Sequence, residues 1–129
     1  MPARILLVED HATMRGALRM VLEGEGFDIG EVADGRTALD AVRRSPPTLV
    51  FLDLNIPGGP GLDVLAAIKA DPATAPIPVI VITAEGEEGR AAAIRAGATD
   101  YLTKPFSPRV LLQAVERALG GSGSPEASP

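Results

Sequence analysis

The sequence contains no cysteine and no tryptophan, and it has one histidine and one tyrosine. Without cysteine the chain forms no disulfide, thiolate zinc site or thiol nucleophile, and a single histidine excludes a metal cage built from several histidines. The longest apolar runs have four or five residues, too few for a signal peptide or a membrane span. We therefore expect a soluble, cytoplasmic protein.

The charge balance is acidic, because 12 lysine and arginine residues stand against 17 aspartate and glutamate residues, giving a formal net charge of −5. This balance argues against binding to nucleic acid or anionic lipid through net charge. A length of 129 residues fits one domain, and 46% hydrophobic residues are enough for a packed core. We expect one globular domain with no nucleic-acid or membrane partner.

Five segments have the composition of β-strands. Residues 5–8, 49–52 and 79–82 are hydrophobic throughout, as strands buried on both faces of a parallel sheet are. Residues 28–33 and 100–102 are more polar, so we place them toward the edges of the sheet.

Segments with the apolar spacing of amphipathic helices alternate with these strands. We predict helices around residues 14–22, 36–44, 62–68, 88–96 and 108–119. Strict alternation with short connections favours right-handed crossovers, and therefore a doubly wound α/β fold with a parallel sheet between two helical layers. In such folds ligands bind beyond the carboxyl ends of the strands.

Polar side chains follow four of the five strands. Glu9 and Asp10 come after the first strand, and Asp53 comes after the third. Thr83 follows the fourth strand and Lys104 the last. Each residue alone has an ordinary role, such as a helix cap, a turn former or a solvated cation. Together, three carboxylates at one edge repel one another unless a cation lies among them, and oxygen donors favour Mg²⁺, which commonly pairs with phosphate. The sequence therefore indicates phosphoryl chemistry.

Four motifs surround these positions: Val8-Glu9-Asp10, Leu52-Asp53-Leu54-Asn55-Ile56-Pro57 with Gly61, Val81-Ile82-Thr83-Ala84, and Ala96-Gly97-Ala98-Thr99-Asp100-Tyr101-Leu102-Thr103-Lys104-Pro105-Phe106. In order and spacing over residues 4–119 they resemble the receiver domain of bacterial two-component response regulators. The resemblance implies a flavodoxin-like (βα)5 sandwich whose parallel strands are ordered 2-1-3-4-5. We assign residues 1–119 to a receiver domain and residues 120–129 to a flexible tail or the start of a linker.

The resemblance implies a signalling domain rather than an enzyme, in which Asp53 accepts a phosphoryl group from a sensor histidine kinase or a histidine phosphotransfer protein. Mg²⁺, or Mn²⁺ in its place, would be held by Asp10, Asp53 and the backbone carbonyl of Asn55, with Glu9 acting through water. Lys104 would pair with Asp53 at rest and with the phosphoryl group after transfer. The domain would catalyse its own phosphotransfer and dephosphorylation.

A conformational switch is also implied by the resemblance. The hydroxyl group of Thr83 would move to the phosphoryl group, and Tyr101 on the last strand would turn into the vacated space. The surface of the fourth helix, fifth strand and fifth helix would then act on a partner or an output domain. Val110 on the fifth helix is a candidate apolar contact for a phosphorylation-dependent homodimer.

Three further positions carry expectations. Asn55 and Glu85 lie where the family tunes the lifetime of the phosphoryl group, and Lys104-Pro105 matches a pair that is cis in the family. His11 is interpreted as the residue that starts the first helix, because Mg²⁺ prefers oxygen ligands.

Other functions on a similar fold fit less well. A flavodoxin-like cofactor binder needs a hydroxyl-rich phosphate loop where this chain has Glu9-Asp10-His11, and neither GxGxxG nor GxxxxGK[ST] occurs. A hydrolase of the haloacid dehalogenase type requires a second aspartate at Asn55. A phosphorylation-independent adaptor or dimerisation module on the receiver fold stays open as the alternative.

Overall fold

The computed structural model describes residues 3–56, 61–84 and 87–120. Strands and helices alternate through them in the order β1 (Arg4–Val8), α1 (Ala12–Gly24), β2 (Asp28–Val32), α2 (Gly35–Arg44), β3 (Leu49–Asp53), α3 (Gly61–Ala70), β4 (Val79–Thr83), α4 (Glu87–Arg95), β5 (Asp100–Thr103) and α5 (Pro108–Ala118). All five predicted strands and five predicted helices are confirmed, with ends that differ by a few residues. The expectations for Glu85 and for residues 121–129 lie outside the described residues.

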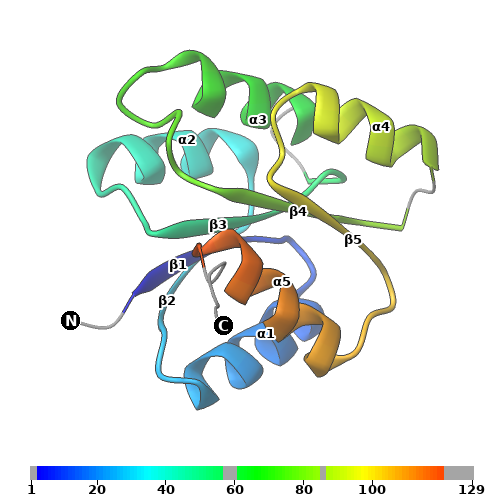
Figure 1. The fold of residues 1–129 in the computed structure, drawn as a ribbon. Coiled ribbons are helices and arrows are strands. Elements are labelled where there is room, and N and C mark those ends of the chain that lie inside the picture. The colour runs from blue at the N-terminus through cyan, green and yellow to red at the C-terminus, as the bar shows by residue number, and fades with distance from the viewer. Residues whose placement is uncertain (1–2, 57–60, 85–86, 121–129) are drawn as a thin grey trace.

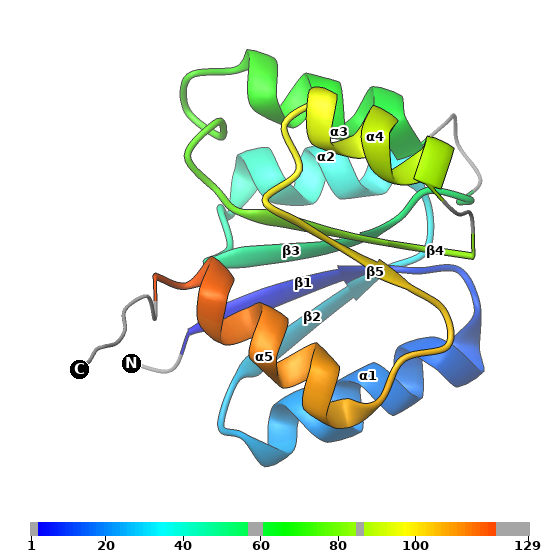
Figure 2. The ribbon, with the colours of Figure 1, turned by 45° about the vertical axis from the view of Figure 1, so that its right-hand side comes forward.

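The strands form one parallel sheet in the order β2-β1-β3-β4-β5. This confirms the flavodoxin-like order, and it places the two more polar strands, β2 and β5, at the edges. The central strands β3 and β4 are buried along their whole length. Figures 1 and 2 show helices α2, α3 and α4 on one face of the sheet and α1 and α5 on the other.

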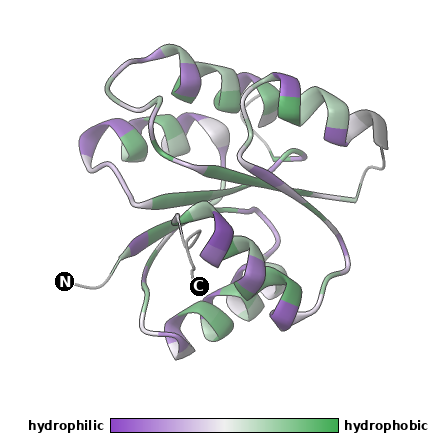
Figure 3. Cartoon of the chain, viewed as in Figure 1, coloured by the Kyte–Doolittle hydropathy of each residue, from purple (hydrophilic) through white to green (hydrophobic). Residues whose placement is uncertain are grey.

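Each face of the sheet has its own hydrophobic core, because successive side chains of a strand point to opposite faces. Leu6, Val50 and Leu52 pack with α2, α3 and α4, whereas Leu7 and Phe51 pack with α1 and α5. In Figure 3 the central strands are mainly hydrophobic, while the helices carry both hydrophobic and hydrophilic residues. The sheet therefore separates two packed layers.

The last helix has a well-defined start. Ser107 is its N-cap and accepts a hydrogen bond from the backbone N–H of Val110 at 3.2 Å, and Pro108 occupies the first turn, where its missing N–H leaves no bond unmade. Among the described residues, none of the helices has both the length and the apolar character needed to span a lipid bilayer.

Candidate functional site

The carboxyl ends of four strands meet at one edge of the sheet. The parallel register pairs Val8 with Leu52, Asp53 with Ile82 and Thr83 with Thr103. One further backbone hydrogen bond extends the pairing beyond β5, because the N–H of Lys104 donates to the carbonyl of Thr83 at 2.9 Å. The polar residues predicted from the strand ends are therefore brought to one edge by backbone pairing.

The ammonium group of Lys104 joins two carboxylates at the centre of this edge. Its Nζ donates to Asp53 Oδ2 at 2.7 Å and to Glu9 Oε1 at 3.2 Å. Both carboxylates are almost fully buried, and the Lys104 side chain is 19% exposed. Burial by itself lowers the pKa of Lys104, but hydrogen bonds to Asp53 and Glu9 outweigh burial and raise the pKa, so the lysine stays charged. Lys104 thus neutralises part of a crowded negative site.

Asp53 has both carboxylate oxygens engaged. Oδ2 accepts from Lys104, and Oδ1 accepts from the backbone N–H of Asn55 at 2.8 Å. Burial raises the pKa of Asp53, yet the bonds from Lys104 and Asn55 oppose burial and leave the pKa below its usual value. The carboxylate is therefore ionised, which is the form that can act as a nucleophile.

Glu9 is the second buried carboxyl group. Its Oε2 accepts from the backbone N–H of His11 at 3.2 Å, while Oε1 contacts Lys104. Burial and the neighbouring Asp53 raise the pKa of Glu9 above its usual value. The Glu9 carboxyl group therefore binds a proton more readily than the carboxyl group of a free glutamate does.

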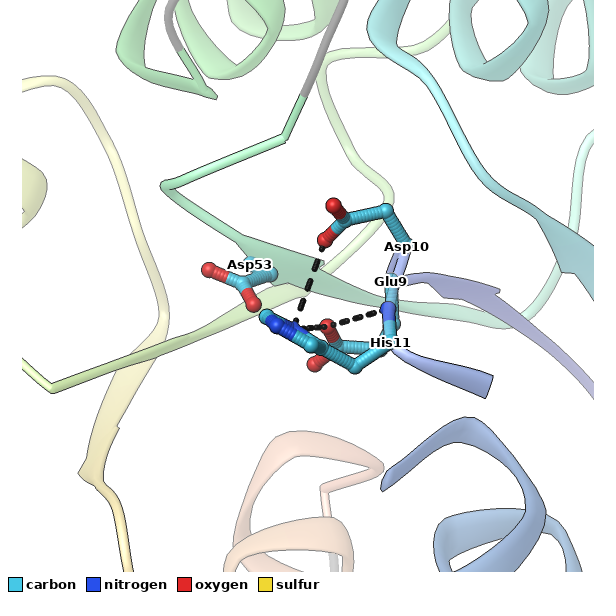
Figure 4. A group of neighbouring side chains, drawn as sticks. All are labelled: Glu9, Asp10, His11 and Asp53. Carbon is cyan, nitrogen blue, oxygen red and sulfur yellow. Dashed lines mark hydrogen bonds and ion pairs between the residues drawn. The ribbon is translucent and has the colours of Figure 1, made fainter. Parts of the chain in front are cut away.

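The outer part of the site contains Asp10 and His11. The Asp10 side chain is 33% exposed and that of His11 72%. Figure 4 shows the imidazole ring of His11 lying among the carboxylates of Glu9, Asp10 and Asp53. In the described part of the chain, these four residues each offer a ligand atom, and all four atoms lie within 4.8 Å of one another. The site holds three carboxyl groups and one ammonium group, and the raised pKa of Glu9 reflects burial as well as this excess of negative charge. These oxygen donors fit a hard divalent cation such as Mg²⁺.

Thr83 and Tyr101 lie on the α3 and α4 side of the sheet. Thr83 is fully buried at the end of β4. Tyr101 pairs with Val81 in register, is half-buried and packs against the core formed with α2, α3 and α4. Since residues two apart share a face, Thr83 lies on the same face as Val81 and Tyr101. The two predicted switch residues are thus near each other on adjacent strands.

Two further structural features lie near the site. The Lys104–Pro105 peptide bond is cis, as the resemblance implied. Arg15, which sequence reasoning missed, donates to the backbone carbonyl of Glu9 at 2.8 Å and to Glu31 Oε1 at 2.7 Å. Arg15 thereby ties the turn that carries Glu9 to β2. The sequence feature that could have indicated this role is the spacing of Arg15 and Arg19, four residues apart on one face of α1. Both side chains donate to Glu31 on β2.

The chain has an open parallel α/β sheet with an acidic pocket and a lysine at its carboxyl edge, which is the architecture of a doubly wound α/β domain with a polar site at the strand ends. Comparison with known proteins identifies its family. The model of the response regulator receiver domain family matches residues 5–116. The chain belongs to the response regulator receiver domain family.

Two curated relatives and one solved structure illustrate the similarity. The chain is 40% identical to the phosphate regulon transcriptional regulatory protein PhoB of Klebsiella pneumoniae and 41% identical to the DNA-binding response regulator MtrA of Mycolicibacterium paratuberculosis. Each alignment covers 92% of this chain and 52% of the relative, so the chain spans about half the length of these relatives.

The solved structure is the receiver domain of sensor histidine kinase PA1611 from Pseudomonas aeruginosa PAO1, with a magnesium ion coordinated in the active site cleft. It matches with a TM-score of 0.86 at 30% identity and covers 93% of this chain and 99% of that one. The chain is therefore a response regulator receiver domain, similar to a solved receiver domain that holds a magnesium ion in its active site cleft.

Proposed function

We propose that Asp53 accepts a phosphoryl group from a phosphohistidine of a sensor kinase or a histidine phosphotransfer protein. The observation that carries this proposal is the buried, ionised carboxylate of Asp53, held at one oxygen by Lys104 and at the other by the N–H of Asn55. Both bonds fix the orientation of the nucleophile before the donor arrives, and phosphoryl transfer depends mainly on positioning and charge stabilisation.

Transfer of the phosphoryl group exchanges a P–N bond of the donor for a P–O bond to Asp53. A carboxylate oxygen of Asp53 forms a bond to phosphorus, and the P–N bond of the donor breaks with its electron pair on the ring nitrogen. A donor ring already protonated on its other nitrogen leaves as neutral imidazole. Lys104 moves its ammonium group from the carboxylate to a phosphoryl oxygen and so keeps the added charge compensated.

The metal ligands proposed are the carboxylates of Asp10 and Asp53 and the backbone carbonyl of Asn55, with Glu9 acting through water. Mg²⁺ bound there supplies positive charge to the phosphoryl oxygens, and Mn²⁺ can replace it. Lys104 and the Asn55 N–H keep Asp53 charged and oriented, so the chain itself prepares the nucleophile. Asn55 is exposed and lies two residues after Asp53. There it would order a water molecule for hydrolysis of the acyl phosphate, which would support dephosphorylation by the domain itself.

We also propose that phosphorylation draws the hydroxyl group of Thr83 toward the site and lets Tyr101 turn inward. The change would reach the surface formed by α4, β5 and α5, which acts on an output domain, a partner or a second copy of the chain in a phosphorylation-dependent homodimer. The acidic balance supports a segment that does not itself bind nucleic acid. The cytoplasmic location expected from the sequence stays a prediction.

Intact-protein mass spectrometry after incubation with acetyl phosphate and Mg²⁺ tests the proposal. We expect one added phosphoryl group that hydroxylamine removes, as an acyl phosphate requires. Asp53→Asn should abolish the gain, whereas Asp63→Asn, the same change at an exposed position on α3, should retain it. If folded wild-type protein gains no phosphoryl group from acetyl phosphate or from a histidine kinase, the phosphorylation-independent adaptor becomes the better description.

A further inference from the structure

His11 adds a nitrogen donor to a pocket that otherwise offers oxygen. Its Nδ1 lies 3.3 Å from Glu9 Oε2 and 3.6 Å from Asp10 Oδ1. Figure 4 shows the ring turned toward the carboxylates rather than away from them. The oxygen of Glu9 that faces His11 is Oε2, because Oε1 is the atom that contacts Lys104. The imidazole and the lysine therefore approach Glu9 at different oxygens.

The spacing of these atoms distinguishes two kinds of metal ion. Tetrahedral zinc with bonds of about 2.0–2.2 Å separates its ligand atoms by about 3.4 Å. Octahedral magnesium with bonds of about 2.0–2.1 Å separates neighbouring ligand atoms by only about 2.9 Å. The two separations from His11 Nδ1, 3.3 and 3.6 Å, are closer to the tetrahedral value than to the octahedral value. The imidazole is thus placed for a small tetrahedral ion.

Donor chemistry points the same way. Imidazole nitrogen is a favoured ligand of zinc and other late first-row metals, while Mg²⁺ selects oxygen. A site with three protein ligands and one position for water is a common zinc arrangement. We propose that His11, together with Glu9 and Asp10, binds Zn²⁺ or a related transition-metal ion, and that this ion competes with Mg²⁺ for the pocket.

This inference deepens the proposed function and rests on it, because Asp10 would serve both ions. The two ions differ in what they leave for the phosphoryl group. Zinc held by three side chains keeps a single open position, whereas Mg²⁺ keeps several water positions that phosphoryl oxygens can fill. Zinc bound through His11 would therefore hold the domain in its unphosphorylated state.

The test compares wild-type protein with His11→Asn and Asp10→Asn by calorimetric titration with ZnCl2 and, separately, with MgCl2. We expect His11→Asn to weaken zinc binding at least tenfold, the scale on which even indirect partners of a metal site act, and to change Mg²⁺ affinity less than twofold. Asp10→Asn should weaken both. Because His11 is the only histidine, a two-dimensional ¹H–¹⁵N spectrum of the imidazole reports this site alone.

The nuclear magnetic resonance readout separates ligation from a simple hydrogen bond. Zinc should shift the Nδ1 resonance of His11, and excess MgCl2 should reverse the shift. Zinc affinity unchanged in His11→Asn, or an imidazole spectrum that zinc leaves unaltered, would overturn the inference. The proposed phosphoacceptor role fails by a different result, the absence of phosphorylation at Asp53 in zinc-free buffer.

Discussion

Lys104 Nζ lies 2.7 Å from Asp53 Oδ2, although 51 positions separate the two residues in the sequence. The contact exists because β5 ends beside β4 and β4 beside β3, so that the chain after β5 returns to the acidic edge. The same ammonium group contacts Glu9 after β1. One side chain thus links the ends of β1, β3 and β5, which are far apart in the sequence.

Removing this cation should affect both stability and phosphorylation. We expect Lys104→Met to lower the free energy of unfolding at pH 7 by about 3 kcal/mol, because it leaves two buried carboxyl groups without their counterion. Urea denaturation without divalent metal measures this loss. Lys104→Arg should lose less stability because it keeps the charge, yet phosphorylate slowly because guanidinium has a different geometry. A Lys104→Met protein as stable as wild type would show that the pair contributes little.

Glu9 gives a prediction about pH. Its pKa is raised in the folded state above the usual value of 4.5, so the folded protein binds a proton more tightly than the unfolded chain does. Stability from this group is therefore fully present below the unfolded pKa and is lost as pH rises through the folded pKa. In the absence of metal, Glu9→Gln should equal wild type in stability below pH 4.5 and exceed it at pH 7.

Thermal denaturation of the two proteins between acidic and neutral pH checks this dependence. A stability difference that does not change with pH would contradict the direction of the pKa shift. Added Mg²⁺ should reduce the advantage of Glu9→Gln, because the cation stabilises the wild-type carboxylates.

Gly61 allows the chain after β3 to pass close to α3. A methyl group there would lie 2.5 Å from Leu54 Cα, which is backbone and has no room to move aside alone. We expect Gly61→Ala to destabilise the fold by about 2 kcal/mol. It should also weaken Mg²⁺ binding, since Leu54 lies between Asp53 and Asn55. Gly16→Ala, with open space around the added methyl group in α1, should instead stabilise by about 0.5–1 kcal/mol.

Tyr101 provides a built-in probe of the proposed switch, because the chain has one tyrosine and no tryptophan. A beryllofluoride complex, which mimics a phosphoryl group, should change the tyrosine fluorescence of the wild-type protein in the presence of Mg²⁺. Thr83→Ala should still accept a phosphoryl group from acetyl phosphate but show a much smaller fluorescence change. Equal fluorescence changes in Thr83→Ala and wild type would show that Tyr101 responds without the Thr83 hydroxyl group, and would contradict a coupled switch.

The sequence predicted those parts of the site that follow from strand position. Hydrophobic runs located the buried strands, and the parallel arrangement then required Glu9, Asp53 and Lys104 to meet at one edge. Side-chain direction and helix phase could not be predicted in this way. His11 is the N-cap of α1, as expected of a residue that starts a helix, but its ring also enters the acidic pocket, which depends on a rotamer.

The contact of Arg15 with Glu31 escaped prediction for a related reason. It depends on how α1 is rotated against β2, and the apolar spacing of a helix defines that rotation only coarsely. Charged side chains reach several positions from one helix face, so their partners are known only when the neighbouring strand is in place.

The division of the interior by the sheet has a consequence for how a signal could be read. Tyr101 packs in the layer of α4, while its neighbour Leu102 packs in the layer of α5. An event that repacks Tyr101 perturbs the first layer and leaves the second as a fixed reference. A partner that contacts both α4 and α5 would therefore respond to a displacement of α4 relative to α5. A ligand that contacts only α1 and α5 would not respond to the repacking of Tyr101.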